Sequence, residues 1–108
     1  AAVARGASEE PRFIEMVYKS PEAGKTVAIV GKGITFDTGG YSLKSMDYMY
    51  GMKDDMSGAA NVLAAMRAVG RARPKVNVIA LIPATENAVR RQDRRDQQHR
   101  RRGAPLDW

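Results

Sequence analysis

The sequence predicts an α/β fold: a partial, mixed or parallel sheet with a strand–helix–strand unit, followed by a disordered basic tail. Two apolar runs, at 26–30 and 76–82, each suit a strand covered on both faces. The segment between them, 57–69, has the pattern of an amphipathic helix. A strand, a helical crossover and a second strand form a unit with parallel strands and a right-handed connection.

The N-terminal part precedes this unit. Residues 1–11 are small and polar, and they are interpreted as a ragged start cut out of a longer protein. Residues 13–19 alternate in polarity, which predicts a strand with Ile14, Met16 and Tyr18 on one face. A Pro- and Gly-containing turn at 20–25 follows. A hairpin joining this strand to the run at 26–30 is therefore expected.

The helix has recognisable ends. Ser57 is the expected N-cap, Gly70 weakens the last turn, and Pro74 stops the helix. Val62, Met66 and Val69 form the expected apolar stripe, with Ala59 and Ala65 close beside it. The strand at 76–82 is expected to close at Pro83. With only one helix to cover the sheet, exposed apolar surface, marginal stability and aggregation of the isolated chain are expected.

Composition excludes several classes of protein. At 108 residues the chain is one domain at most, or a piece of one. It has no cysteine, no signal peptide and no apolar run of the ~20 residues that a membrane span needs, so the cytoplasm is the expected compartment.

The net charge of +6 comes mainly from the C-terminal end. Residues 89–108 hold seven arginines and three aspartates, a charge of +4, whereas the other 88 residues hold 11 basic and 9 acidic groups, a charge of +2. The stretch from Arg90 to Arg102 has no aliphatic residue to bury, so the tail is expected to be disordered or loosely helical.

The stretch at 31–58 is where chemistry is expected. Asp37 and Asp55 are hard oxygen ligands suited to Mn, Mg or Zn, although two loop aspartates are more often merely solvated. Lys32 lies between two glycines at a strand end, where desolvation would make its neutral amine available to a metal. Lys44 can stay charged and stabilise an oxyanion. Ligands of such sheets bind beyond the carboxyl ends of strands, where Lys32 and Asp37 lie, and where Glu86–Asn87 follow the second run.

Other motifs fail. Residues 23–26 resemble the end of a phosphate loop, but position 19 is lysine where a glycine is required. The glycines at 31 and 33 are followed by Phe36 where a dinucleotide fingerprint needs a third glycine. The single histidine, His99, lies in the tail, so a Ser-His-Asp or zinc–histidine site cannot be assembled.

The central stretch resembles the catalytic domain of the leucine aminopeptidase (cytosol aminopeptidase) family. The matching motifs are Val-Gly-Lys-Gly-Ile-Thr-Phe-Asp-Thr-Gly-Gly at 30–40, Ser-Leu-Lys at 42–44, Met-Lys-Asp-Asp-Met at 52–56 with Ser-Gly-Ala-Ala after it, and Ile-Pro-Ala-Thr-Glu-Asn at 82–87. The resemblance covers about residues 12–87 and implies that 12–88 are a fragment of a larger aminopeptidase catalytic domain.

The resemblance also implies roles for individual residues. Lys32, Asp37 and Asp55 match the family's metal ligands, with Asp37 between two divalent ions, Mn or Zn. Lys44 matches the catalytic lysine that polarises the substrate carbonyl, and Met52 matches a residue of the substrate side-chain pocket. The family removes N-terminal residues, often leucine, from peptides and assembles as a homo-hexamer.

Part of the family's site is absent from this sequence. The family continues into an Asn-Thr-Asp-Ala-Glu-Gly-Arg segment whose Asp and Glu complete the two-metal site and whose Arg holds a bicarbonate. Nothing after Asn87 matches it, and a shift of reading frame there is our hypothesis for the arginine-rich tail. The chain alone is therefore expected to bind metal weakly and turn over little substrate. Asp47, Asp54 and Glu86 are interpreted as solvated or structural.

Two alternatives from other classes stay open. The tail at 89–108 could neutralise nucleic-acid phosphates in a non-catalytic basic module. No aromatic side chain interleaves with its arginines, so base stacking is unsupported and nucleic acid is the less favoured partner. The chain could also be a degenerate aminopeptidase paralogue that packs into an assembly without chemistry.

Overall fold

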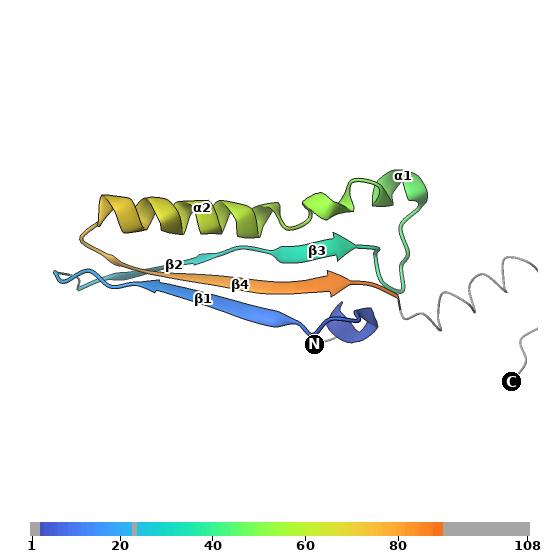
Figure 1. Ribbon diagram of the computed structural model, residues 1–108, viewed down its shortest axis with the longest axis horizontal. Coiled ribbons are helices and arrows are strands. Elements are labelled where there is room, and N and C mark those ends of the chain that lie inside the picture. Colours follow the sequence, from blue (N-terminus) through green and yellow to red (C-terminus); the bar gives the residue numbers. More distant parts are fainter. Residues whose placement is uncertain (1–2, 23, 90–108) are drawn as a thin grey trace, which may run out of the picture.

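A computed structural model describes residues 3–22 and 24–89, and it consists of one sheet with one long helix on its face (Figure 1). The elements in chain order are η1 (Val3–Gly6), β1 (Arg12–Tyr18), β2 (Thr26–Val30), β3 (Gly33–Asp37), α1 (Met46–Met49), η2 (Met52–Asp54), α2 (Ser57–Ala72) and β4 (Asn77–Asn87). Positions 90–108, most of the predicted tail and the basis of the nucleic-acid alternative, lie outside the described residues.

Strand β4 is the centre of the sheet, since it pairs with each of the other three strands. It pairs with β1 antiparallel along one edge. Along its other edge it pairs in parallel first with β2, from Asn77 to Leu81, and then with β3, from Ala84 to Asn87. Strands β2 and β3 therefore follow one another along the same edge, and only Gly31 and Lys32 separate them.

The pairing confirms one prediction and corrects another. β2 and β4 are parallel neighbours joined through α2, as the strand–helix–strand pattern predicted. The expected hairpin is wrong: β1 pairs with β4 and not with β2. The apolar strand β4 takes the central position because only there are both of its backbone edges hydrogen-bonded.

The segment at 33–37 was not predicted as a strand, and β4 does not end at Pro83. β3 starts at a glycine and carries an irregularity: Ile34 pairs with Thr85 and Asp37 with Asn87, so β3 has one residue more than β4 over this interval. Such a bulge bends the strand and redirects its side chains. β4 continues through Pro83, because the next residue, Ala84, is paired on both edges of the strand, with Arg12 of β1 and Gly33 of β3.

Helix α2 ends as predicted but starts differently. Its N-cap is Met56 and not Ser57; the Ser57 hydroxyl donates to the carbonyl of Asp54 instead. At its C-terminal end Arg73 adopts a left-handed conformation with φ 48°, and its N–H donates to Val69, just before Pro74.

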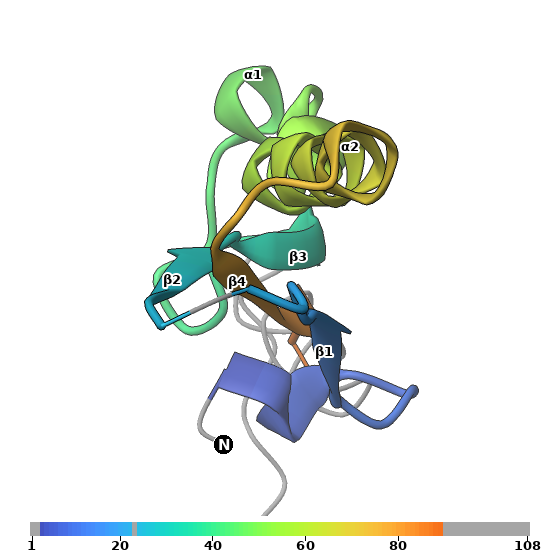
Figure 2. The same ribbon diagram turned by 90° about the vertical axis from the view of Figure 1, so that its left-hand side faces the viewer.

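The core lies between α2 and the sheet. Its buried cluster consists of Ala59, Val62, Ala80 and Ile82, against which Met16, Ile29, Met66 and Ala84 pack. The predicted stripe is therefore right for Val62 and Met66, whereas Val69 is only half-buried. Of the two alanines beside it, Ala59 is buried and Ala65 is exposed. Figure 2 looks along the sheet and shows α2 covering one face only.

The face turned away from α2 keeps exposed apolar side chains. Phe13, Val17 and Val30 pair across the sheet with Pro83, Ile79 and Leu81, which alternate with the core residues of β4. Their exposed fractions are 67%, 48% and 68%. The expectation of exposed apolar surface is thus confirmed. Among the described residues, the helices are too short or too polar to cross a membrane.

Candidate functional site

The site lies where the chain crosses from β2 to β3, both of which pair with β4. Here Gly31 meets the first turn of α2: a Cβ on Gly31 would lie 2.5 Å from the carbonyl oxygen of Gly58. The backbone N–H of Ala59 donates to the carbonyl of Lys32 at 3.0 Å. Since only glycine permits this approach, the N-terminal end of α2 packs directly against the two residues that separate β2 from β3. This contact brings Lys32 beside the residues that precede α2.

Lys32 forms an ion pair with Asp55, which lies between η2 and α2. The Nζ atom donates to Oδ1 at 2.8 Å and lies 2.7 Å from Oδ2. That second contact is a close approach of charges without hydrogen-bond geometry, because the buried Oδ2 has no hydrogen-bond partner among the described residues. The Lys32 side chain is 60% exposed, so the expectation that Lys32 is desolvated is wrong for this structure.

A second pair joins Lys44 to Asp37 at the end of β3. Lys44 Nζ lies 3.4 Å from Asp37 Oδ2, and both side chains are mostly buried, at 29% and 15% exposed. The connecting loop turns sharply at Gly39 and Gly40, whose φ angles are +89° and +64°. The N–H of Lys44 then donates to the carbonyl of Thr38 at 2.9 Å. The double glycine therefore returns Lys44 to Asp37.

Asp37 is held in its charged form. Burial by itself would raise the pKa of its carboxyl group. The N–H of Gly39, the side-chain amide of Asn87 and the ammonium of Lys44 outweigh burial, so the pKa of Asp37 is lowered below its ordinary value. A permanently ionised carboxylate is what a divalent cation requires.

Met52, the predicted pocket residue, begins η2 and is half-buried. Asp47 and Asp54 are exposed, Glu86 is half-buried within β4, and none of these three joins either ion pair. In residues 3–22 and 24–89, no three Asp, Glu, His or Cys side chains gather into a metal-binding group.

The residues present fit part of a divalent-metal site. Each of two carboxylates lies beside an amine from another part of the chain, and carboxylate oxygen is a preferred donor for Mn²⁺ and Zn²⁺. The buried Oδ2 of Asp55 has a charged neighbour but no hydrogen bond. Oδ2 of Asp37 likewise has only the ammonium 3.4 Å away. Each pair is already close to neutral, so these groups alone would hold a cation weakly.

Two residues near the site were not predicted to belong to it. Asn87 donates from Nδ2 to Asp37 Oδ1 at 2.6 Å, and Thr38, at 6% exposed, is a buried polar residue. Asn87 had been noted only for its place after an apolar run. The available signal was that Asp37 and Asn87 both follow strands whose carboxyl ends lie at one edge.

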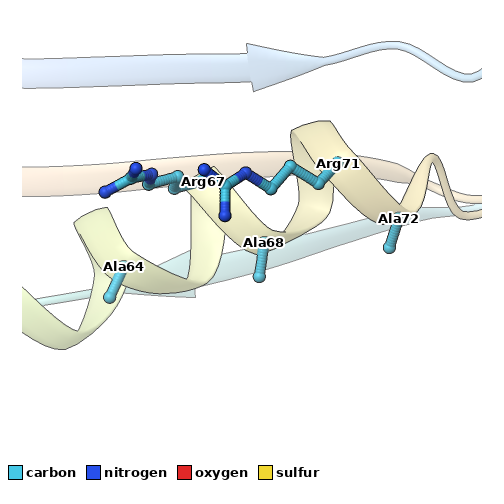
Figure 3. Close-up of a pocket in the computed structure, with 5 residues that line it drawn as sticks. All are labelled: Ala64, Arg67, Ala68, Arg71 and Ala72. Atoms are coloured by element: carbon cyan, nitrogen blue, oxygen red, sulfur yellow. The ribbon is translucent and has the colours of Figure 1, made fainter.

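A depression elsewhere on the surface contains none of these residues. It runs along α2 and is lined by Ala64, Arg67, Ala68, Arg71 and Ala72 (Figure 3). The two arginine side chains lie alongside one another over the helix in Figure 3, and both residues are exposed. The depression is therefore a feature of the outer helix surface and not of the candidate site.

Comparison with known proteins agrees with this geometry. Residues 1–97 match the cytosol aminopeptidase family, catalytic domain. The apo leucyl aminopeptidase from Trypanosoma cruzi is 40% identical, with a TM-score of 0.77 over 82% of this chain and 17% of that protein. The bottromycin maturation enzyme BotP is 43% identical, with a TM-score of 0.71 over 83% of this chain and 18% of BotP.

A second structure of BotP, in complex with Mn, is 44% identical, with a TM-score of 0.76 over 83% of this chain and 19% of that one. The chain thus spans less than a fifth of the length of these solved proteins. It belongs to the cytosol aminopeptidase family and carries part of that family's catalytic domain.

Proposed function

We propose that this chain supplies part of the active site of a two-metal leucyl aminopeptidase, which hydrolyses N-terminal residues from peptides. The observation that supports the proposal is the pair of lysine–aspartate contacts, Lys32 with Asp55 and Lys44 with Asp37. The fold assembles them from segments that the sequence separates by up to 23 residues. Because the rest of the family's ligands are absent here, the 108-residue chain alone has little or no activity.

Lys32, Asp37 and Asp55 would hold the divalent ions. When bound, such ions supply an activated water and neutralise developing negative charge. The Lys32 nitrogen can act as a ligand only after losing its proton. Asp55 retains one buried carboxylate oxygen, Oδ2, without a hydrogen bond among the described residues, and Asp37 Oδ2 faces the Lys44 ammonium.

Lys44 is proposed to act on the substrate and not as a metal ligand. Its ammonium lies beside the Asp37 carboxylate and is one of the groups that lower the pKa of Asp37. A fixed positive charge at this point orients a peptide carbonyl and stabilises the oxygen as negative charge develops on it. Met52, three residues before Asp55, is proposed to contact the side chain of the residue that is removed.

The remaining features rest on the family. Mn or Zn as the metal, bicarbonate held by an arginine elsewhere in the domain, a cytosolic location and a homo-hexamer are inferred from family membership. The Mn in one BotP structure supports the choice of metal.

A chimera tests the proposal. Residues 12–87 would replace the matching segment of the trypanosomal leucyl aminopeptidase, which supplies the rest of the domain. We expect manganese-dependent hydrolysis of a leucyl amide by the chimera and none by the free 108-residue chain. Lys44→Met should abolish the activity, whereas Lys53→Met, at an exposed lysine outside both ion pairs, should not.

A folded, manganese-loaded chimera without activity would contradict the proposal and favour a degenerate paralogue. Rapid turnover by the free chain would contradict the expectation that its own site is incomplete.

A further inference from the structure

The two oxygens of the Asp37 carboxylate have different surroundings. Oδ1 accepts two hydrogen bonds, from the N–H of Gly39 at 2.9 Å and from Nδ2 of Asn87 at 2.6 Å. Oδ2 has only the Lys44 ammonium, at 3.4 Å. Two donors fix one oxygen and thereby fix the plane of the carboxylate, so that the other oxygen is held toward the side of Lys44.

Asn87 is itself held firmly. Both the N–H and the hydroxyl of Thr38 donate to its backbone carbonyl at 2.9 Å. Across the strands it is the register partner of Asp37, next to the bulge of β3. A Cβ on Gly40 would lie 3.0 Å from its Oδ1, so the bend at Gly40 passes directly over the amide group. The side chain therefore has little room to rotate away from Asp37.

An amide suits this position for a chemical reason. A carboxylate only accepts hydrogen bonds, so the NH₂ end of the amide must face Asp37. Because the amide is neutral, it orients the carboxylate without competing with a cation for its charge. A lysine or arginine would compete with the cation, and an aspartate would repel the carboxylate.

We propose that Asn87 is a positioning residue, which holds the Asp37 carboxylate so that Oδ2 is presented to a divalent cation. This inference rests on the proposed function, because it assumes that Asp37 binds metal. Residues that orient a ligand in this way typically change metal affinity by about 10–100-fold when they are removed.

The test compares Mn²⁺ binding by the full 108-residue chain and two variants, followed by electron paramagnetic resonance of the unbound ion. Asn87→Ala removes the amide from Asp37. Asn61→Ala is the matched control, since it makes the same substitution at an exposed position of α2 outside both ion pairs. Thermal unfolding of both variants reports any loss of structure.

We expect Asn87→Ala to weaken Mn²⁺ binding by about tenfold or more, while Asn61→Ala leaves Mn²⁺ binding unchanged. Equal Mn²⁺ affinity of wild type and a folded Asn87→Ala would overturn the positioning role and leave the proposed function intact. A wild-type chain without any Mn²⁺ binding would instead overturn the proposed metal ligands, and the positioning role with them.

If Asn87→Ala does not fold, the wild-type chain provides the decisive measurement. In its NMR spectrum, one proton of the Asn87 side-chain amide should exchange slowly with solvent, and Asp37→Ala should remove this protection. Fast exchange of both amide protons in the folded wild type would overturn the inference.

Discussion

Gly31 and Gly58 are in direct contact, with the backbone of a strand end pressed against the first turn of a helix 27 positions later in the chain. No side chain fits between them: a Cβ on Gly31 would also lie 2.8 Å from a methyl carbon of Val62. This contact sets the distance from which Lys32 reaches Asp55, so it couples the stability of the fold to the geometry of the site.

Gly31→Ala should therefore destabilise the chain and disturb the site together. Overpacking of this kind costs about 1–3 kcal/mol, and the displaced helix terminus should weaken Mn²⁺ binding. Urea unfolding and Mn²⁺ titration measure the two effects. Gly70→Ala is the control, because a Cβ there meets nothing within 4 Å and the helix should gain about 0.5–1 kcal/mol. Equal stability of the two variants would contradict the close contact.

The Lys32–Asp55 ion pair should matter for metal and little for stability. Ion pairs with one exposed partner contribute about 0–1 kcal/mol, and Lys32 is 60% exposed. Lys32→Met should thus unfold at nearly the wild-type urea concentration but lose Mn²⁺ binding. Lys75→Met, which breaks the exposed pair with Glu22, should leave both unchanged. A loss of Mn²⁺ binding in the Lys75 variant would indicate a nonspecific charge effect.

Acid should weaken the fold partly through Asp37. The pKa of this carboxyl is lower in the folded chain than its ordinary value of 3.8. The resulting stabilisation is therefore present above pH 3.8 and is lost as the pH falls below that value toward the lowered pKa. Asp37→Asn removes the titrating group, so its free energy of unfolding should depend less on pH between pH 5 and the acid limit than that of wild type. Identical pH dependence in urea titrations would show that the Asp37 contacts do not persist in solution.

Ile82 should be the most sensitive core position, since it is 1% exposed and lies between α2 and the sheet. Ile82→Ala should cost about 2–5 kcal/mol and Ile82→Val about 0.5–1.5 kcal/mol. Circular dichroism during thermal unfolding distinguishes the two variants. A chain that tolerates Ile82→Ala without a lower transition would lack the packed core described above.

The exposed apolar side chains on the sheet face away from α2 should drive self-association. Phe13 and Val30 are each about two-thirds exposed on the face away from α2. The double variant Phe13→Ser/Val30→Thr should scatter less light at a given concentration, with little change in the unfolding transition. Polar substitution at the buried Val62 is the contrasting variant, which should increase scattering by unfolding the chain.

The parts of the fold that were predictable are those set by local pattern. The strand–helix–strand unit follows from apolar runs and spacing that lie within 26–82. The partner of β1 did not follow, because both faces of β1 carry apolar residues and its pairing spans the whole sheet. The exposure of Lys32 could not be foreseen either, since it depends on what covers the strand break.

The site shows the same division. Asp37, Lys44 and Asp55 stand out because charged residues lie among glycines over a short stretch. The contact of Asn87 with Asp37 joins positions 50 residues apart. This contact exists because β3 and β4 are neighbouring strands whose pairing contains a one-residue irregularity. Neither the pairing nor the irregularity can be predicted from the identities of Asp37 and Asn87.

The central position of β4 has a consequence for biosynthesis. β1, β2 and β3 all leave the ribosome before β4, the strand with which each of them pairs. Tyr18 of β1, for example, pairs with Val78, which lies 60 positions later in the chain. Until β4 emerges, three β-forming segments have open backbone edges, which is a state prone to misassociation. The nascent chain therefore depends on protection of these edges while α2 is synthesised, and on rapid closure once β4 has emerged.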